Sequence, residues 1–265
     1  ADLPQLRRAL RNVLKTRVIP SLLLRGRGLY KTARFKDPKY VGDPVNAVKI
    51  FNEKEVDEII VLDISATTEK KEPNFALIEE IASECFMPLG YGGGVTTIDQ
   101  MRRLYRLGVE KIALNTAAFT DRHLVEAGCK TFGSSSVIAS IDTKSTLFGK
   151  REVWINGGRV NTKVDPVRYA EQLARLGVGE ILVNSIDRDG TMSGYDIELL
   201  KMLSAAVDVP IIACGGAGSL EHMQEAVTAA GVPAVAAGSM FVFHGRHRAV
   251  LINYPARAEL EARLP

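Results

Sequence analysis

The first and second halves of the chain carry two copies of one pattern. Tyr91-Gly-Gly-Gly-Val95 in the first half corresponds to Cys214-Gly-Gly-Ala-Gly218 in the second, and Ala113–Ala117 corresponds to Ala236–Met240. Both pairs are separated by the same 123 residues, from 91 to 214 and from 113 to 236. A constant offset over several segments indicates duplication of a structural unit rather than scattered similarity. We therefore expect two similar halves of four strands each.

Short β-branched runs alternate with helix-like segments along the chain. Apolar, near-continuous strands separated by helices are typical of a parallel sheet. Eight such units in about 250 residues favour a (β/α)8 barrel, a TIM barrel, over an open doubly wound sheet. The twofold repeat supports closure, because two half-barrels complete one another. The predicted strands are 17–24, 58–64, 87–91, 110–115, 136–142, 179–185, 209–214 and 233–238, and the predicted helices are about 43–54, 73–84, 97–106, 121–128, 165–175, 196–206, 219–229 and 247–262.

The domain organisation is simple. No Pro/Gly/Ser-rich linker divides the chain, so residues 15–265 are expected to form a single barrel domain. Residues 1–14 form a basic, weakly amphipathic extension, which we interpret as a short peripheral helix or a disordered lead. A targeting peptide is the alternative, but the Ser content usual in such peptides is missing.

Composition excludes several functional classes. The net charge of +3 comes without the clustered basic stripe of a nucleic-acid-binding protein. Cys85, Cys129 and Cys214 are isolated, with no CxxC and no nearby His pair, which argues against disulfides or a zinc site and fits a reducing cytoplasm. No apolar run approaches the length of a membrane span. We therefore expect a cytoplasmic protein without a metal or cofactor.

The two copies differ at the end of their first strand. The first copy reads Val18-Ile-Pro-Ser-Leu-Leu23 and the second Val137-Ile-Ala-Ser-Ile-Asp142, so Leu23 stands where the second copy has Asp142. Catalytic side chains of such barrels come from strand ends and the loops that follow them. A positioned carboxyl that acts as general acid or base contributes about 10²–10⁴-fold in rate, and a leucine has no titratable proton. This asymmetry is the main clue to function.

Glycine and small polar residues occupy other strand ends. Gly93-Gly94 and Gly215-Gly216 are each followed one strand later by a polar pair, Asn115-Thr116 or Gly238-Ser239. Backbone N–H groups in such turns can approach an anion closely. Each glycine pair alone could equally serve a tight turn without any ligand. The symmetric positions in a duplicated barrel favour a ligand with a phosphate at each end, lying across the barrel mouth.

Several motifs resemble the cyclase subunit of imidazole glycerol phosphate synthase, a (β/α)8 barrel of histidine biosynthesis. The resemblance runs from about Lys15 to the C-terminus, and Ser185–Asp196 is its most specific segment. In that family, ammonia from a glutaminase subunit passes through the barrel and cleaves a bisphosphate substrate, giving an imidazole and an aminoimidazole carboxamide ribotide. The other motifs are Gly42-Asp-Pro44, Leu62-Asp-Ile64, Gly92-Gly-Gly94, Asn115-Thr-Ala-Ala118 and Gly215-Gly-Ala-Gly218.

The resemblance implies that cyclisation is lost. The family uses two aspartates, at the ends of the first and fifth strands, and these fall on Leu23 and Asp142. Rescue of activity by Asp189 or Asp63 is the alternative. The chain resembles more closely a side branch of the family that occurs with a glutaminase and a sugar amidotransferase, where the set makes acetamidino groups on surface-polysaccharide sugars of the lipopolysaccharide O-antigen type. Three segments carry this finer resemblance: Phe51–Glu55, Glu84–Pro88 and Phe243–Pro255.

The family's ammonia gate is a ring of four charged residues at the bottom of the barrel. These positions fall on Arg17, Glu58, Lys111 and Glu180, and all four charges are present. Any one of them alone could be a solvated rim charge, but two acids and two bases together can be buried at acceptable cost. Glu110 is expected to face a docked glutaminase. The implied partners are a separate glutaminase in a heterodimer and a sugar amidotransferase, with neither nucleic acid nor membrane.

Other residues leave alternatives open. Lys31 lies in the long first loop, Tyr30–Gly42, and matches a family lysine that closes over substrate, which favours a retained phosphorylated ligand. Trp154 lies on a predicted β-hairpin after the fifth strand and serves as a lid or as packing. An active cyclase of histidine biosynthesis remains the main alternative function, and a phosphate-binding isomerase of the same lineage is a weaker one. His222, His244 and His247 are expected to be surface or packing residues.

Overall fold

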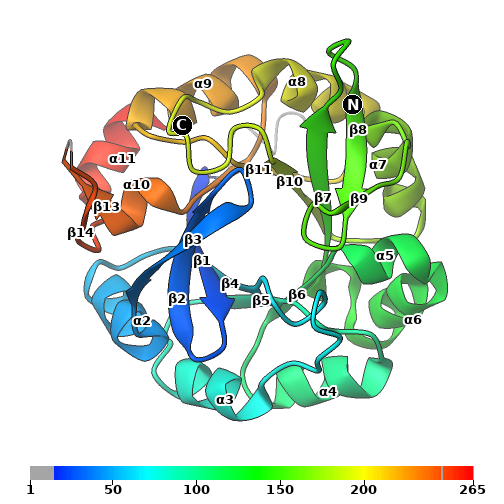
Figure 1. The fold of residues 1–265 in the computed structure, drawn as a ribbon, viewed down its shortest axis with the longest axis horizontal. Coiled ribbons are helices and arrows are strands. Elements are labelled where there is room, and N and C mark those ends of the chain that lie inside the picture. Colours follow the sequence, from blue (N-terminus) through cyan, green and yellow to red (C-terminus); the bar gives the residue numbers. More distant parts are fainter. Residues whose placement is uncertain (1–14, 246, 265) are drawn as a thin grey trace, which may run out of the picture.

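Eight parallel strands close into a barrel in the computed structural model, which describes residues 15–245 and 247–264 (Figure 1). The order is β1-β4-β5-β6-β7-β10-β11-β12, and β12 pairs in parallel with β1 to complete the circle. Closure leaves no barrel edge exposed. This confirms the predicted (β/α)8 fold. The barrel strands are β1 Arg17–Arg25, β4 Ile59–Asp63, β5 Leu89–Gly92, β6 Lys111–Leu114, β7 Val137–Ser145, β10 Glu180–Ser185, β11 Ile211–Cys214 and β12 Ala234–Ala237.

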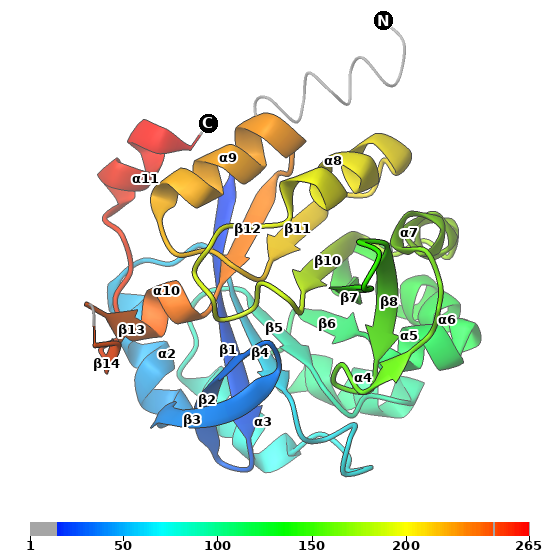
Figure 2. The same ribbon diagram turned by 45° about the horizontal axis from the view of Figure 1, so that its top comes forward.

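Helices surround the barrel as an outer layer (Figures 1 and 2). Their starts follow from local sequence, since Pro44 and Pro166 occupy first-turn positions of α2 and α7, where a missing N–H costs nothing. In α4, Thr97 and Gln100 form a capping box that satisfies backbone donors at the helix start. The long helices are α2 Pro44–Glu53, α3 Phe75–Ser83, α4 Ile98–Arg106, α6 Arg122–Phe132, α7 Pro166–Arg175, α8 Ile197–Ala206 and α9 Leu220–Ala230, and the shorter ones are α5 Thr116–Thr120, α10 Ser239–Val242, α11 Arg257–Arg263 and the 3-10 turn η1 Ser134–Ser136.

The internal repeat extends beyond the strands. In each half, the first barrel strand continues into an antiparallel hairpin, β2–β3 after β1 and β8–β9 after β7. In each half, a short helix also follows the fourth strand, α5 after β6 and α10 after β12. Figure 1 shows β2–β3 crossing in front of β1 and β8 lying beside β7. The hairpin strands are β2 Gly28–Ala33, β3 Lys36–Gly42, β8 Arg151–Ile155 and β9 Val160–Asn161.

Two separate apolar layers hold the fold together. The larger lies between the barrel and the helices and includes Phe51, Ile78 and Met101, all of them fully buried. The smaller lies inside the barrel, because alternate residues of a strand point to opposite faces. Burial at about 25 cal/mol per Å² of apolar area makes these layers the main stabilising contribution. The inner layer consists of Ile19, Ile60, Ala113, Ile138, Leu182, Ile212, Cys214, Ala234 and Ala236.

One predicted helix is wrong. Residues 247–262 were expected to be helical, but within the described residues only Arg257–Arg263 form a helix there, α11. Before it, β13 Phe243–His244 pairs with β14 Ala249–Val250 in a small two-stranded sheet. Pro255 explains the late start, because its ring disfavours the helical conformation of the preceding residue. The basic extension 1–14 lies outside the described residues, and no helix within the described part of the chain is long and apolar enough to cross a membrane.

Candidate functional site

A large cavity opens at the carboxyl ends of the barrel strands. Its volume is about 970 Å³, enough for a ligand of substantial size. This cavity is lined by all the residues that the sequence predicted to be catalytic or to bind phosphate, and also by the predicted loop lysine. These residues are Leu23, Lys31, Asp63, Gly93, Gly94, Asn115, Thr116, Asp142, Asp189, Gly215, Gly216, Gly238 and Ser239.

Asp142 retains its proton close to neutrality. It lies on β7, where the strand leaves the barrel and begins to pair with β8, and it is 8% exposed. Burial, followed by the nearby charge of Asp189, raises the pKa of the Asp142 carboxyl to about 7. A carboxyl with such a pKa can both donate and accept a proton at physiological pH.

Leu23 occupies the opposite wall of the barrel. It lies on β1, four barrel strands away from β7, and its register partner on β4 is Leu62, which also lines the cavity. This wall is therefore apolar where the wall of β7 carries a carboxyl. Strand β1, Arg17–Arg25, contains no carboxyl side chain, so none faces Asp142 from the first strand.

A buried ion pair fastens the first hairpin to the barrel. Lys31 Nζ on β2 lies 2.9 Å from Asp189 Oδ1, and the Thr32 hydroxyl donates to Asp189 Oδ2 at 3.0 Å. The backbone N–H of Arg34 donates to the Asp189 carbonyl at 2.8 Å. Gly190 has φ +73°, and a Cβ there would lie 2.3 Å from the Thr32 carbonyl oxygen, so only glycine allows this approach. These contacts to Asp189 and Gly190 hold the hairpin closed over the cavity.

Asp63 has a local structural role. Its Oδ1 accepts hydrogen bonds from the Ser65 N–H and hydroxyl at 2.9 Å each and from the Ala66 N–H at 3.0 Å. A carboxylate oxygen with three donors of its own loop orders the segment that follows β4. Asp189 is likewise committed to Lys31 and Thr32, so both supporting aspartates have defined partners.

The residues predicted to bind phosphate differ between the halves. In the first half, Thr116 Oγ1 accepts from the Asn156 N–H at 2.9 Å, and Asn115 Nδ2 donates to the Ser140 carbonyl at 3.0 Å. In the second half, Ser239 Oγ is buried without a hydrogen-bond partner among the described residues. Within residues 15–245 and 247–264, no side chain caps the first N–H groups of α5 or α10. The predicted phosphate-binding side chains of the first half therefore have hydrogen-bond partners, whereas the Ser239 hydroxyl of the second half has none among the described residues.

The glycines are also needed by the fold itself. A Cβ at Gly93, where φ is +124°, would lie 2.5 Å from the Asp63 carbonyl oxygen. A Cβ at Gly216, where φ is +113°, would lie 2.1 Å from the Gly194 carbonyl oxygen. Tight βα turns alone thus account for these glycines.

Sequence reasoning missed several side chains of the cavity. Asn184 on β10 is the register partner of both Asp142 on β7 and Cys214 on β11, and its Oδ1 is buried without a hydrogen-bond partner in the described part of the chain. Burial raises the pKa of the Cys214 thiol to about 12, with Asp189 adding to the effect, so this thiol is not a nucleophile at neutral pH. Asn184 directly precedes the most specific sequence motif, which was the available signal.

The predicted hairpin residue Trp154 lies on β8, opposite Asp142. The Lys144 ammonium lies 4.9 Å from the centre of its ring, within cation–π range. His222 Nδ1 accepts from the Gly218 N–H at 3.2 Å, and His244 and His247 are exposed. The histidines are surface and packing residues, as predicted.

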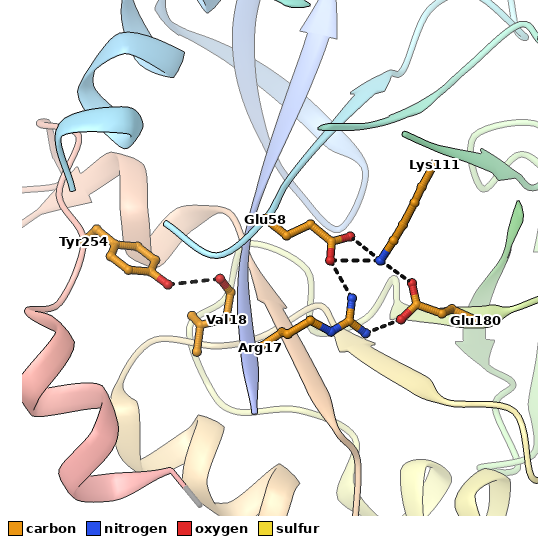
Figure 3. A network of polar contacts seen from close by, with 6 residues as sticks. All are labelled: Arg17, Val18, Glu58, Lys111, Glu180 and Tyr254. Carbon is orange, nitrogen blue, oxygen red and sulfur yellow. Dashed lines mark hydrogen bonds and ion pairs between the residues drawn. The ribbon is translucent and has the colours of Figure 1, made fainter. Parts of the chain in front are cut away.

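A closed ring of four charges lies at the opposite end of the barrel (Figure 3). Arg17 contacts both Glu58 and Glu180, and Lys111 Nζ lies 3.0 Å from Glu58 and 2.8 Å from Glu180. Each cation therefore contacts both acids. Burial would lower the pKa of the Arg17 guanidinium, but Glu180 and Glu58 outweigh it and raise the pKa.

The two acids of the ring are buried, unlike ordinary rim charges, whereas the side chains of Arg17 and Lys111 are half-buried. Glu58 is 3% exposed and Glu180 8% exposed. The Tyr254 hydroxyl donates to the Val18 carbonyl at 3.0 Å and fixes the start of β1 beside the ring (Figure 3). Glu110, next to Lys111, is exposed. The two bases compensate the two acids, which makes burial of the acids tolerable.

The fold and cavity define a (β/α)8 barrel of two half-barrel repeats, with its candidate site at the carboxyl ends of the strands. The chain belongs to the histidine biosynthesis protein family, whose model matches residues 17–248. It is 52% identical to a Pseudomonas aeruginosa protein named "Putative imidazole glycerol phosphate synthase subunit hisF2", over 92% of this chain and 97% of that protein. It is 48% identical to a similarly named Leptospira borgpetersenii protein, over 96% and 100%. It is 41% identical to the "Imidazole glycerol phosphate synthase subunit HisF" of a Hydrogenobaculum species, over 87% and 92%.

Proposed function

We propose that this chain is the barrel subunit of a glutamine-dependent amidotransferase system and that it conducts ammonia without cyclising a substrate. The observation that carries the proposal is the contrast between the two ends of the barrel. At one end the four-charge ring of Arg17, Glu58, Lys111 and Glu180 is complete, and its two acids are buried. At the other end Asp142 faces the apolar Leu23 rather than a second carboxyl.

A single carboxyl limits the chemistry that the cavity supports. Ring formation with loss of a leaving group needs a proton removed at one atom and supplied at another, and one group near pKa 7 does not hold both positions at once. Asp63 and Asp189 are engaged by their own loop and by Lys31, which speaks against simple rescue. The four-charge ring at the other end of the barrel, by contrast, lacks none of its members. Its retention supports selection for ammonia transfer and for docking of a glutaminase around Glu110.

The expected acceptor of the ammonia is a separate sugar amidotransferase. This step follows from the resemblance to the side branch that forms acetamidino groups on surface-polysaccharide sugars. The chain then binds the glutaminase at the end of the barrel that carries the four-charge ring and conducts ammonia to the sugar amidotransferase. The predicted phosphate-binding residues of the cavity would bind a phosphorylated ligand, and binding of this ligand would activate the glutaminase.

The first experiment measures complex formation. The chain should form a one-to-one complex at micromolar concentrations with the glutaminase subunit of its own organism. Glu110→Lys should weaken the complex, because it reverses a charge on the proposed docking face, whereas Glu198→Lys on the exposed surface of α8 is the matched control. Failure to form a complex with the glutaminase contradicts docking.

The second experiment measures cyclisation. The unmodified chain, supplied with the histidine-pathway bisphosphate and ammonium salts, should turn over at least about 10²-fold more slowly than a family member with both aspartates. Efficient turnover would return the chain to histidine biosynthesis.

An active cyclase is the second candidate function. It is favoured by the cavity, because every residue predicted to bind phosphate lines it and Lys31 is in place under the closed hairpin. The same turnover assay separates the two candidates.

A further inference from the structure

A second cavity lies behind the β2–β3 hairpin. Its volume is about 560 Å³, and it shares Lys36, Asp37 and Gly190 with the main cavity. The hairpin therefore separates the two spaces. The other walls come from the end of β7, from the loop after β10 and from the C-terminal segment, which contribute Lys144, Asp187 and Arg248.

Four cations line this second cavity: Arg34, Lys36, Lys144 and Arg248. None of them forms an ion pair with any residue that the structure describes. Asp37 and Asp187 are the acids in the wall, and Asp187 Oδ2 accepts from the Ser145 N–H at 2.7 Å. The wall thus carries an excess of two positive charges. Such an excess in a concave site attracts anions.

Neighbouring groups orient these cations without neutralising them. Arg34 Nε donates to the Asp187 carbonyl at 3.2 Å, and an Arg248 Nη donates to the Gly190 carbonyl at 3.2 Å. Both guanidinium groups are held by neutral oxygens and keep their remaining N–H donors. The ammonium of Lys144 lies against the Trp154 ring.

The acid opposite Lys144 has other partners. Glu152 is the cross-strand register partner of Lys144, but its carboxylate is bonded by Asn161 Nδ2 at 2.7 Å. Lys150 and Lys163 also lie within 3.9 Å of it. Lys144 therefore stays available to a ligand.

We propose that this second cavity binds a small phosphate-bearing anion, a phosphomonoester or a diphosphate, distinct from any ligand of the main cavity. Two guanidinium forks and two ammonium groups match the several oxygens of a doubly charged phosphate better than a single carboxylate. The cations come from the hairpin, from β7 and from the C-terminal segment. A bound anion therefore bridges the hairpin to the barrel and holds the main cavity closed.

The single tryptophan provides the readout. Trp154 contacts Lys144, so an anion that binds Lys144 changes the surroundings of the ring. Titration with inorganic pyrophosphate, with excitation selective for tryptophan, should give a saturable change. Arg34→Gln combined with Lys144→Gln should weaken binding by about tenfold or more, since two ligand charges are lost. The matched control is Lys150→Gln. Lys150 lies in the loop between β7 and β8, close to Lys144 in sequence but outside the cavity, so this variant should bind pyrophosphate as the unmodified chain does.

A main-cavity variant separates the two sites. Ser239→Asp places a negative charge where the main cavity would hold a phosphate, and it should leave the pyrophosphate response intact. Trypsin should cleave after Arg34 and Lys36 more slowly when pyrophosphate is present. The proposal is overturned if Ser239→Asp abolishes the response, if the double variant binds normally, or if the response never saturates and shows an adventitious ion only. Parallel titration with a sugar phosphate and with inorganic phosphate distinguishes the sources of the anion.

Discussion

Asp142→Asn should remove a pH dependence from the stability of the protein. The folded-state pKa of Asp142 is about 7, against an ordinary 3.8 for the unfolded chain. The folded state therefore binds this proton more tightly. The stability that the proton contributes is full below pH 3.8 and is lost as pH rises through 7. Linkage with these two values gives a loss of roughly 2–3 kcal/mol between pH 5 and pH 8.

Urea unfolding at pH 5, 6, 7 and 8 measures this effect. The unmodified chain should lose roughly that amount relative to Asp142→Asn, whose amide has no proton to release. Asp99→Asn is the matched control, because Asp99 is 90% exposed and should leave the pH slope unchanged. Parallel stability curves for the unmodified chain and Asp142→Asn would refute both the raised pKa and its assignment to burial.

Two further substitutions test the two ends of the barrel. Glu58→Ala leaves Arg17 and Lys111 with one acid between them, which should cost about 3 kcal/mol of stability. Glutamine-dependent transfer should then fall more than transfer from added ammonium, and an equal fall in both assays would mean a structural role only. Leu23→Asp restores the carboxyl opposite Asp142 and should raise turnover of the histidine-pathway bisphosphate above that of the unmodified chain. The new charge beside Leu62 costs stability, so Leu23→Asn, which has similar size and no charge, is the control for folding.

The barrel was predictable because its signals are local and repeated. Apolar runs mark the strands, and the constant offset of 123 residues indicates two matching halves. The strand ends then give the cavity residues, because parallel strands end at one face. The β2–β3 hairpin was not predictable in the same way. Its turn residues Arg34 and Phe35 have φ of 53° and 60°, a conformation usually signalled by glycine or asparagine.

The partners of the site residues could not be read from the sequence either. Thr32 binds Asp189 across 157 residues, a contact that only the closed barrel creates. The buried, unpartnered oxygen of Asn184 depends on packing, since an asparagine at a strand end is more often satisfied. The predicted helix 247–262 was wrong before Arg257, because Pro255 disfavours the helical conformation of the residue before it and Ala249–Val250 pair with β13 instead.

The inner apolar layer acts as a filter for charge. Ile19, Ile60 and Ala113 each lie two residues beyond a member of the ring, on the face that points into the barrel, and they separate the ring from the cavity. Moving an ion of ammonium size into an apolar medium costs on the order of 20 kcal/mol in the idealised limit. A nitrogen donor that crosses this layer must therefore travel as neutral ammonia and leave its proton on the ring side. The same cost applies to protons and metal cations, so the layer opposes their passage between the two ends of the barrel far more strongly than that of a small uncharged molecule.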